Sequence, residues 1–403
     1  MEAEIELIPE GTVTSARGFQ AGATFASINK KAKYNLDLGI LFSEAPSVAV
    51  GLFTTNKIKA APVVLCQKRL PSKSIKAVVV NSGLANAGTG EQGFADAISM
   101  AALAAKKIEV QPESVLVAST GVIGQRLNLE LLRAGIARVT LSGDGGHALA
   151  QAMLTTDTVT KEVAVRVKGN EFIIGGVAKG SGMIHPRLGT LLSLLTTDAA
   201  VDMDFLSTAL RNAVDISFNM VSIDGDTSPN DTVLLMANGL ADNGLIKQRT
   251  KSATAFQRAL NQVCIYLAKA IARDGEGAGR LIEVTVSGAL SLASARSAAR
   301  TIASSPLVKA AVHGSDPNWG RIIAALGRSG AEVVESKISL SMSGIRLVEE
   351  GIALPFDVKK AVLALNNDEV SISINLNLGR ARATAWGCDL SSDYVTINSQ
   401  YTT

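Results

Sequence analysis

Apolar positions in the first third of the chain alternate between short runs and helical spacing. Runs rich in valine or small apolar residues, each closed by a polar residue or glycine, predict strands at Ser47–Thr54, Ala77–Val80 and Ser114–Ala118. The alanine-rich segment Gly93–Lys107 predicts a helix, and Asn128 is placed to cap another. Strands separated by helices indicate an α/β or α+β fold, with antiparallel sheets expected.

A hairpin is predicted immediately before the most glycine-rich loop. Val163–Val167 and Phe172–Val177 have strand character, and Gly169-Asn170 between them is a turn sequence. The hairpin leads directly into Lys179–Thr190, which reads KGSGMIHPRLGT. This loop therefore joins a strand to the apolar run that follows it.

Longer helical stripes occupy the middle of the chain. Asp204 is placed to cap a helix, and the residues on one face of that helix are Leu206, Leu210 and Val214. A second stripe ends at Asp274 and consists of Phe256, Leu260, Val263, Leu267 and Ile271. Each helix is expected to bury this apolar face.

The pattern changes near residue 285. Beyond it, apolar and polar residues alternate, which is typical of a half-buried sheet. The alternating apolar residues are Ile338, Leu340, Met342, Val370, Ile372, Ile374, Leu376 and Leu378. We therefore expect a main α/β domain over residues 1–285 and a smaller C-terminal α/β domain over residues 286–403.

Composition disfavours several classes of protein. The chain has 403 residues, 47% hydrophobic and 19% charged, so it can bury a large core. The net charge of +3, with 4% aromatic residues and no basic block, disfavours nucleic-acid binding. No apolar run reaches the roughly 18–20 residues that span a bilayer, and the N-terminus lacks the apolar core of a secretory signal. Three widely spaced cysteines, Cys66, Cys264 and Cys388, suggest reduced thiols and a cytoplasmic protein.

The sequence offers little for a metal or a cofactor. His147, His185 and His313 lack metal-ligand spacing. Asp224 lies in IDGDTSPND, which lacks the spaced glycine and final glutamate of a calcium loop, so a turn with side-chain caps is favoured. KGSG is not a dinucleotide-binding motif, and we expect neither metal nor cofactor. A Ser-His-Asp triad stays open, although no G-x-S-x-G elbow is present.

The Gly189-Thr190 bond has features of a self-cleaving site. Attack by the Thr190 hydroxyl on the Gly189 carbonyl is unhindered, because glycine has no side chain. Cleavage would free an α-amine that titrates near ~7.7–8.0 and can act as the base for its own hydroxyl. Most Gly-Thr pairs mark an ordinary turn, so the dipeptide alone favours a turn, and only the longer context and its companion motifs favour cleavage.

Two further turns have candidate chemistry. ASTGVIG follows a predicted strand, and its small residues allow backbone N–H groups to point at a developing oxyanion. DGEGA places Glu276 between glycines, where its carboxylate is able to hold an ammonium group. Taken alone, each motif is better explained as an ordinary turn at the end of a strand or helix.

Together these motifs resemble the ornithine acetyltransferase (glutamate N-acetyltransferase) family. The similarity covers ASTGVIG, KGSGMIHPRLGT followed by TTDA, DGEGA, DPNWGR and the ending INSQYTT, in order over nearly the whole chain. It implies a layered α-β-β-α sandwich of the kind these enzymes share with related aminopeptidases. It also implies processing into Met1–Gly189 and Thr190–Thr403, with two copies of each chain in a heterotetramer.

The resemblance further implies transfer of an acetyl group from N2-acetylornithine to glutamate in arginine synthesis. Some members of the family also accept acetyl-CoA. By motif, Thr190 is the nucleophile that carries the acetyl group, and Thr120 and Gly121 form the oxyanion hole. The residues implied to bind the amino-acid substrate are Thr156, Lys179, Thr190, Glu276, Asn398 and Thr403.

The cleavage segment departs from the family pattern. The family usually has alanine before the threonine and Asn-Met ahead of it, whereas this chain has Arg187-Leu188-Gly189. Glycine still permits cleavage, and Leu188 has a volume similar to that of methionine. Two alternatives stay open, an N-terminal-nucleophile aminopeptidase of similar fold and a non-catalytic metabolite-binding protein.

Overall fold

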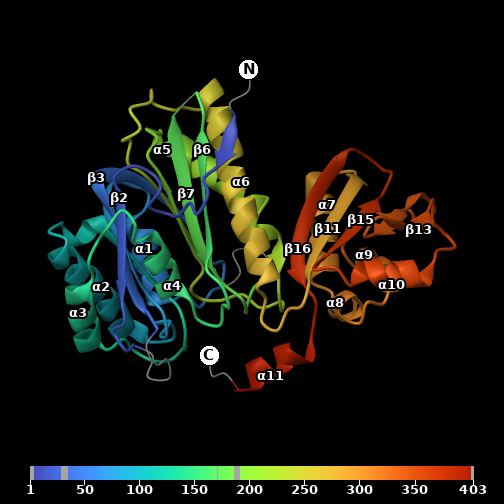
Figure 1. Ribbon diagram of the computed structural model, residues 1–403, viewed down its shortest axis with the longest axis horizontal. Coiled ribbons are helices and arrows are strands. Elements are labelled where there is room, and N and C mark those ends of the chain that lie inside the picture. Colours follow the sequence, from blue (N-terminus) through green and yellow to red (C-terminus); the bar gives the residue numbers. More distant parts are fainter. Residues whose placement is uncertain (1–3, 29–34, 170, 186–190, 401–403) are drawn as a thin grey trace.

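The computed structural model describes residues 4–28, 35–169, 171–185 and 191–400. Two β-sheets, each with helices packed against it, form the body of the protein (Figure 1). The Gly189-Thr190 bond, Thr403 and Asn170 lie outside the described residues. Among the described helices, none combines the length and apolar character needed to cross a membrane.

The first sheet contains nine of the described strands in the order β1-β6-β7-β8-β10-β3-β4-β5, with β2 paired to β3. Strands β8 and β10 run parallel at its centre, and β6 and β7 form the predicted antiparallel hairpin. The bounds are β1 Ile5–Leu7, β2 Phe19–Thr24, β3 Leu38–Phe53, β4 Ser72–Asn81, β5 Val115–Ser119, β6 Lys161–Val167, β7 Phe172–Lys179, β8 Leu192–Thr197 and β10 Thr232–Ala237.

Helices cover both sides of this sheet. Helices α5 and α6 pack against each other and against strands that include β3, β6 and β7, whereas α1 to α4 pack on the side of β2 to β5 (Figure 1). The bounds are α1 Ala61–Arg69, α2 Gly90–Lys107, α3 Leu129–Arg138, α4 Gly146–Met153, α5 Met203–Asp215 and α6 Lys251–Arg273. The predicted α/β class and its layered sandwich are thus confirmed.

The second sheet has the order β14-β13-β12-β15-β11-β16-β9. Helix α7 packs against β11 and β16, and α9 packs against α7. The strands are β9 Val221–Ser222, β11 Leu281–Ala289, β12 Ser339–Met342, β13 Ile345–Glu349, β14 Ile352–Ala353, β15 Glu369–Asn375 and β16 Ala381–Cys388. The helices are α7 Leu292–Ala303, α8 Pro306–His313, α9 Trp319–Gly327, α10 Val358–Leu365 and α11 Ser392–Gln400.

Short 3-10 turns occupy Pro112–Ser114, Phe218–Met220 and Glu335–Lys337. Strand β9 precedes α6 in the chain, yet it pairs in parallel with β16 of the second sheet. The expected boundary near residue 285 falls inside β11. The division into two domains therefore remains a proposal.

Local expectations were met where apolar spacing or a cap decided them. The apolar stripe of α6 is buried, and the Asn128 side chain accepts the N–H groups of Glu130 and Leu131 at the start of α3. The predicted cap at Asp204 is wrong, because the Asp202 side chain accepts the Phe205 N–H and Asp204 lies inside the first turn. Two aspartates two residues apart made the helix start ambiguous.

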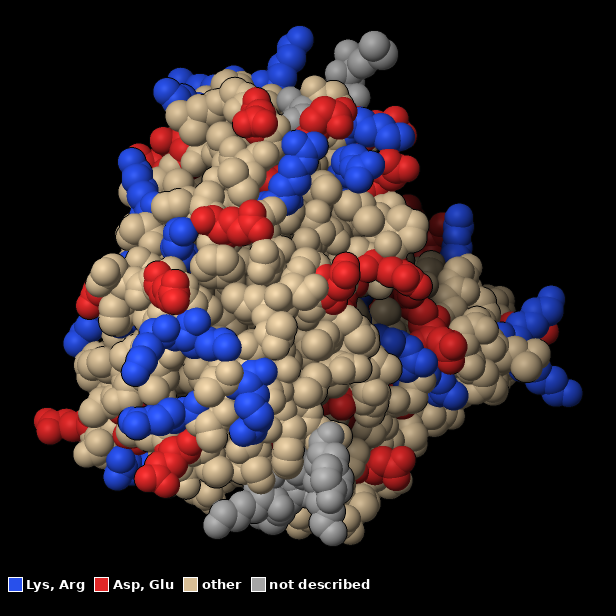
Figure 2. Space-filling model, turned by 60° about the vertical axis from the view of Figure 1, so that its left-hand side comes forward, with Lys and Arg blue, Asp and Glu red and all other residues tan. Residues whose placement is uncertain are grey.

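Charged side chains of both signs are interspersed on the face of the molecule shown in Figure 2. The described cysteines Cys66, Cys264 and Cys388 are free and buried. Burial raises the pKa of the Cys66 thiol to about 12. These cysteines therefore behave as small core side chains.

Candidate functional site

A cavity of about 120 Å³ lies where loops from distant parts of the chain meet. The end of β5, the loop after α4, the end of β7, the loop before β10, the turn after α6 and helix α11 all contribute to its wall. Its lining residues are Ala85, Thr120, Gly121, Ile123, Thr155, Thr156, Lys179, Gly182, Met183, Asp224, Asp226, Ser228, Asn230, Glu276, Tyr394 and Asn398.

Lys179, at the end of β7, places a buried cation on one wall of the cavity. Its Nζ donates to Thr155 Oγ1 at 2.7 Å and to Thr120 Oγ1 at 3.2 Å, and lies 3.8 Å from Asp157 Oδ2. Burial lowers the pKa of Lys179, whereas Asp157 and Glu276 favour its charged form. A lysine in this position can pair with the carboxylate of a small ligand.

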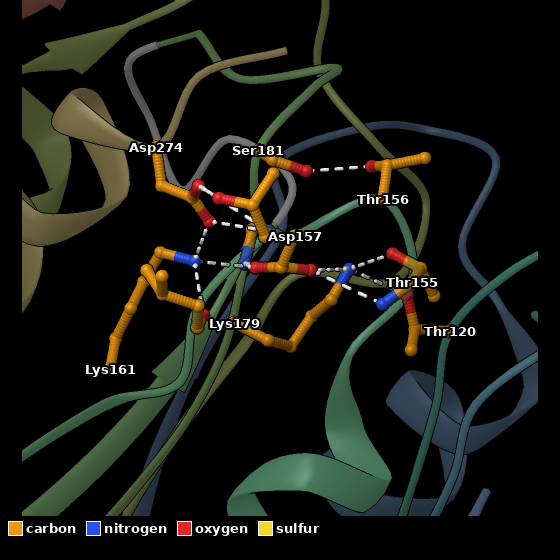
Figure 3. A network of polar contacts seen from close by, with 11 residues as sticks. Thr120, Thr155, Thr156, Asp157, Lys161, Lys179, Ser181 and Asp274 are labelled. Carbon is orange, nitrogen blue, oxygen red and sulfur yellow. Dashed lines mark hydrogen bonds and ion pairs between the residues drawn. The ribbon is translucent and has the colours of Figure 1, made fainter. Parts of the chain in front are cut away.

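A row of buried charges lies behind Lys179 (Figure 3). Lys161 donates to Asp157 at 2.8 Å and to Asp274 at 2.6 Å, and its side chain is fully buried. Burial acts to raise the pKa of Asp157, but Lys179 and Lys161 overcome it and hold that pKa at about 2. Asp157 also accepts the Gly180 N–H at 2.6 Å, so it fixes the backbone that carries Lys179.

Glu276 provides a carboxylate on the same cavity. Asn398 Nδ2 of α11 donates to Glu276 Oε2 at 2.8 Å, and the Glu276 N–H donates to Ser181 O at 2.8 Å. A Cβ at Gly182 would lie 2.5 Å from the Glu276 carboxyl carbon, so a side chain there would displace the Glu276 carboxylate from its present position. Thr156 joins the same wall through a 2.6 Å contact between its hydroxyl and that of Ser181 (Figure 3).

The turn after β5 brings Thr120 and Gly121 to the cavity. Gly121 has φ +124°, and a Cβ there would lie 2.3 Å from the carbonyl carbon of Gly83. The Thr120 N–H donates to Asn81 O at 3.0 Å. Thr120 can therefore offer its hydroxyl, rather than its backbone N–H, to a bound ligand. Asn230 supports this turn by donating to Ser119 O and Ala85 O.

The acidic loop before β10 is a turn held by side-chain caps, as predicted. Asp224 accepts the N–H groups of Met183, Ile184 and Asp226, so it ties this loop to the glycine-rich segment. Burial raises the pKa of Asp224. No group of three or more His, Cys, Asp or Glu side chains within the described part of the chain is arranged to hold a metal ion.

The structure brings six of the residues chosen from the sequence to one cavity: Thr120, Gly121, Thr156, Lys179, Glu276 and Asn398. Gly189, Thr190 and Thr403 lie outside the described residues. The DPNWGR motif does not line the cavity. Its Asn318 instead caps α9 by accepting the Arg321 N–H. None of the three histidines lines it, so a Ser-His-Asp triad has no support at this site.

Sequence reasoning missed the charges behind Lys179. Asp157 belongs to LTTD at residues 154–157, a four-residue motif that recurs at 195–198. The motif was a possible signal, but two short copies of a sequence also arise by coincidence. Asp274 was identified only as the end of a helix.

A larger open hollow of about 1580 Å³ runs beside the cavity, along the loops before β2 and β6, the end of α6 and the start of α11. It reaches Asp274, Lys161 and His147 but contains neither Lys179 nor Glu276. The smaller cavity is the better candidate site, because its charged and polar groups converge on one small space.

The fold and this cavity define an α/β enzyme with a site for a small, charged molecule. The ArgJ family profile matches residues 20–403. The chain belongs to the ArgJ family.

Relatives and a solved structure agree with this assignment. The arginine biosynthesis bifunctional protein ArgJ of Dehalococcoides mccartyi (strain CBDB1) is 51% identical to this chain, and the match covers 100% of both chains. The protein of the same name from Symbiobacterium thermophilum (strain DSM 24528 / JCM 14929 / IAM 14863 / T) is 49% identical, over 98% of this chain and 99% of that one. A crystal structure of ArgJ from Bacillus halodurans is 44% identical with a TM-score of 0.50, covering 51% of this chain and 97% of that one.

Proposed function

We propose that the chain is an N-terminal-threonine acetyltransferase that moves acetyl from N2-acetyl-L-ornithine to L-glutamate in arginine biosynthesis. The observation that carries the proposal is a single cavity with a buried lysine, Lys179, and a carboxylate, Glu276, in its wall. Acetylornithine has an α-carboxylate and a side-chain ammonium, so its two charges match these groups. Membership of the ArgJ family supports the same assignment.

The nucleophile in this proposal is Thr190, released by cleavage of the Gly189-Thr190 bond. Cleavage gives chains 1–189 and 190–403, and the freed α-amine serves as the base for the Thr190 hydroxyl. The match to the B. halodurans ArgJ structure includes 97% of that chain but only 51% of the present chain. The B. halodurans chain in that structure is therefore about half as long as the present one. A chain of half length supports a processed enzyme.

The reaction then proceeds in two steps through a Thr190 ester. The hydroxyl attacks the acetyl carbonyl, the C–N bond to ornithine breaks, and the hydroxyl proton passes through the α-amine to the departing nitrogen. The amine of glutamate attacks the ester, takes the acetyl group and regenerates the hydroxyl. The Thr120 hydroxyl and the Gly121 N–H are proposed to stabilise the oxyanion of each step.

Substrate binding is assigned to Thr156, Lys179, Glu276, Asn398 and Thr403. Glutamate has a second carboxylate in place of the ornithine ammonium, so we expect Glu276 to bind it less favourably. The proposal includes acetyl-CoA as an additional donor, a heterotetramer of two copies of each chain, and a cytoplasmic enzyme. The bifunctional name of the relatives is compatible with a second donor.

The test combines intact-mass measurement with an acetyl-transfer assay using acetylornithine and glutamate. Two polypeptides divided between Gly189 and Thr190, together with acetyl transfer, are expected. Thr190→Ala should stay uncut and inactive, and Thr190→Ser should keep part of both functions because a hydroxyl remains. Thr208→Ala, an exposed threonine on α5, is the matched control and should be cut and active.

One full-length species that stays intact and transfers no acetyl group would contradict the proposal. A cut protein that releases amines from amino-acid amides without acetyl transfer would favour an aminopeptidase. An intact protein that only binds metabolites would favour a binding protein.

A further inference from the structure

Thr155, in the loop after α4, lines the candidate cavity but has no role in the proposed function. Its hydroxyl oxygen lies 2.7 Å from Lys179 Nζ, closer than the 3.2 Å between the same nitrogen and the Thr120 hydroxyl (Figure 3). The Thr155 N–H donates to Asp157 Oδ2 at 3.2 Å. Both the hydroxyl of Thr155 and the backbone that carries it are therefore held in place.

The direction of the hydrogen bond from Lys179 decides what the Thr155 hydroxyl can do next. A lysine ammonium group has three N–H donors and no acceptor, and the nearby Asp157 favours this charged form of Lys179. Thr155 Oγ1 is therefore the acceptor, and its own hydrogen has to be donated elsewhere. Within the part of the chain that the structure describes, that hydrogen meets no acceptor.

The neighbouring threonine shows why this is a distinguishing feature. The Thr156 hydroxyl lies 2.6 Å from the Ser181 hydroxyl, so its hydrogen can be satisfied within the protein. The Thr155 hydroxyl borders the cavity and accepts from a cation instead. Neighbouring hydrogen bonds polarise one another, so accepting from Lys179 makes the Thr155 hydroxyl a stronger donor.

An ammonium group bonded to a hydroxyl with a free hydrogen suits a carboxylate. One carboxylate oxygen can take an N–H of Lys179 while the other takes the O–H of Thr155, and hydrogen bonds to a charged acceptor are the stronger kind. Glu276 places a negative charge elsewhere on the cavity wall, which favours a cation there and leaves Lys179 for the anionic group.

We propose that Thr155 is a further substrate-binding residue, whose hydroxyl donates a hydrogen bond to the α-carboxylate that pairs with Lys179. The inference rests on the proposed function and adds a residue to its substrate site. Acetylornithine and glutamate both have an α-carboxylate, so Thr155 serves the donor and the acceptor alike. Glu276, in contrast, matches only the ammonium group of the donor.

The test compares the wild type with Thr155→Val, which removes the hydroxyl at similar shape, and with Thr155→Ser, which keeps it. Thr160→Val is the matched control, because Thr160 lies on the same loop but lines the larger hollow rather than the cavity. Thr120→Val removes the other hydroxyl that accepts from Lys179. Steady-state kinetics gives kcat and KM for both substrates, and calorimetry measures binding of ornithine and of glutamate without turnover.

We expect Thr155→Val to raise KM for acetylornithine and for glutamate roughly 10- to 100-fold, with a smaller change in kcat, because a hydrogen bond to a charged group is lost. Calorimetry should show weaker binding of both amino acids by a similar factor. Thr155→Ser should restore most of the loss, and Thr160→Val should match the wild type. Thr120→Val should lower kcat more than it raises KM, because its hydroxyl is proposed to stabilise the oxyanion.

An unchanged KM in Thr155→Val, a rise for only one of the two substrates, or no recovery in Thr155→Ser would overturn the inference. So would equal rises of KM in Thr155→Val and Thr120→Val, which would mean that both hydroxyls only hold Lys179. A Thr155→Val chain that fails to fold would assign the hydroxyl to stability instead. A wild type that binds both amino acids but transfers no acetyl group would refute the proposed function, whereas the calorimetric comparison would still decide whether Thr155 binds a carboxylate.

Discussion

Asn398 and Glu276 are 122 residues apart in sequence, yet a 2.8 Å hydrogen bond joins their side chains at the candidate site. Asn398 belongs to α11, a terminal helix that buries none of its residues and stands apart from both sheets in Figure 1. Ser391, just before this helix, donates to Gly277 O at 2.6 Å. The turn that carries Glu276 and Gly277 therefore contacts the C-terminal helix both just before its start and near its end.

We predict that Asn398→Asp weakens binding of acetylornithine. The substitution keeps the shape of the side chain but replaces the Asn398 amide donor with a second carboxylate. Glu276 then loses this hydrogen bond, and repulsion between the two carboxylates moves it away from the position in which it would bind the substrate ammonium. Hydrogen bonds to charged groups contribute about 1.5–3 kcal/mol, so KM should rise on the order of 10- to 100-fold with a smaller change in kcat. Steady-state kinetics measures this.

Ser399→Ala is the control for that prediction. Its hydroxyl donates to Thr396 O within the same helix at 2.9 Å. An unchanged KM in Asn398→Asp, or an equal rise in Ser399→Ala, would contradict the assigned role of Asn398.

Much of the fold could be predicted because local apolar spacing decides it. The stripe from Phe256 to Ile271 is a buried face of α6, and the alternation at Val370, Ile372 and Ile374 is the buried side of β15. Each pattern reports which side of an element loses water. The cap at Asn128 was equally local.

The charged interior of the site could not be predicted in the same way. Asp157 and Asp274 lie 117 positions apart in the sequence, and both bond to Lys161. Neither spacing nor composition reveals such a contact, since only the pairing of strands and the end of α6 bring these residues together. Polar residues at strand ends are usually solvated, so a buried triad was not expected.

Removal of the central cation of this triad should destabilise the fold. Lys161→Met leaves Asp274 and Asp157 buried without the lysine that bonds both of them. Breaking a buried ion pair by deleting one partner costs about 3–5 kcal/mol. Urea unfolding should show this loss, whereas Lys168→Met, which removes an exposed lysine paired with Glu4 and Glu6, should unfold close to the wild type. Equal midpoints for the two variants would refute the prediction.

Stability should also depend on pH through Asp157. Lys179 and Lys161 overcome the effect of burial and hold its folded pKa at about 2, below the ordinary value of 3.8. A group with a lowered folded pKa stabilises the protein above its unfolded pKa and loses that contribution as the pH falls through the folded value. The contribution is therefore complete above about pH 4 and disappears between about pH 4 and pH 2.

Asp157→Asn isolates this dependence. We expect a variant that is less stable than the wild type at pH 7, with a smaller further loss on acidification through the same window. The free energy of unfolding, measured at intervals from pH 7 downward, checks this. Parallel curves for the two proteins would exclude Asp157 as a source of the acid sensitivity.

Gly121→Ala should damage both stability and transfer, because the backbone of this turn has no room for a methyl group. Gly121 has φ +124°, and its added Cβ would lie 2.3 Å from the carbonyl carbon of Gly83, a backbone atom that cannot rotate away. Strained backbone and overpacking each cost about 1–3 kcal/mol, and any relief requires the Thr120–Gly121 turn to shift. Because Gly121 lines the cavity, such a shift should lower kcat more than it raises KM.

Gly124→Ala separates the close contact from the backbone angle. Gly124 also has a positive φ, +83°, but an added Cβ there meets nothing within 4 Å. The control should therefore lose only the roughly 1–2 kcal/mol of the left-handed conformation and keep its kcat. Unfolding and steady-state kinetics of the two variants, measured side by side, distinguish the contributions. An equal loss of kcat in Gly124→Ala and Gly121→Ala would contradict the prediction. It would show that the close contact between Gly121 and the Gly83 backbone does not hold the turn at the cavity.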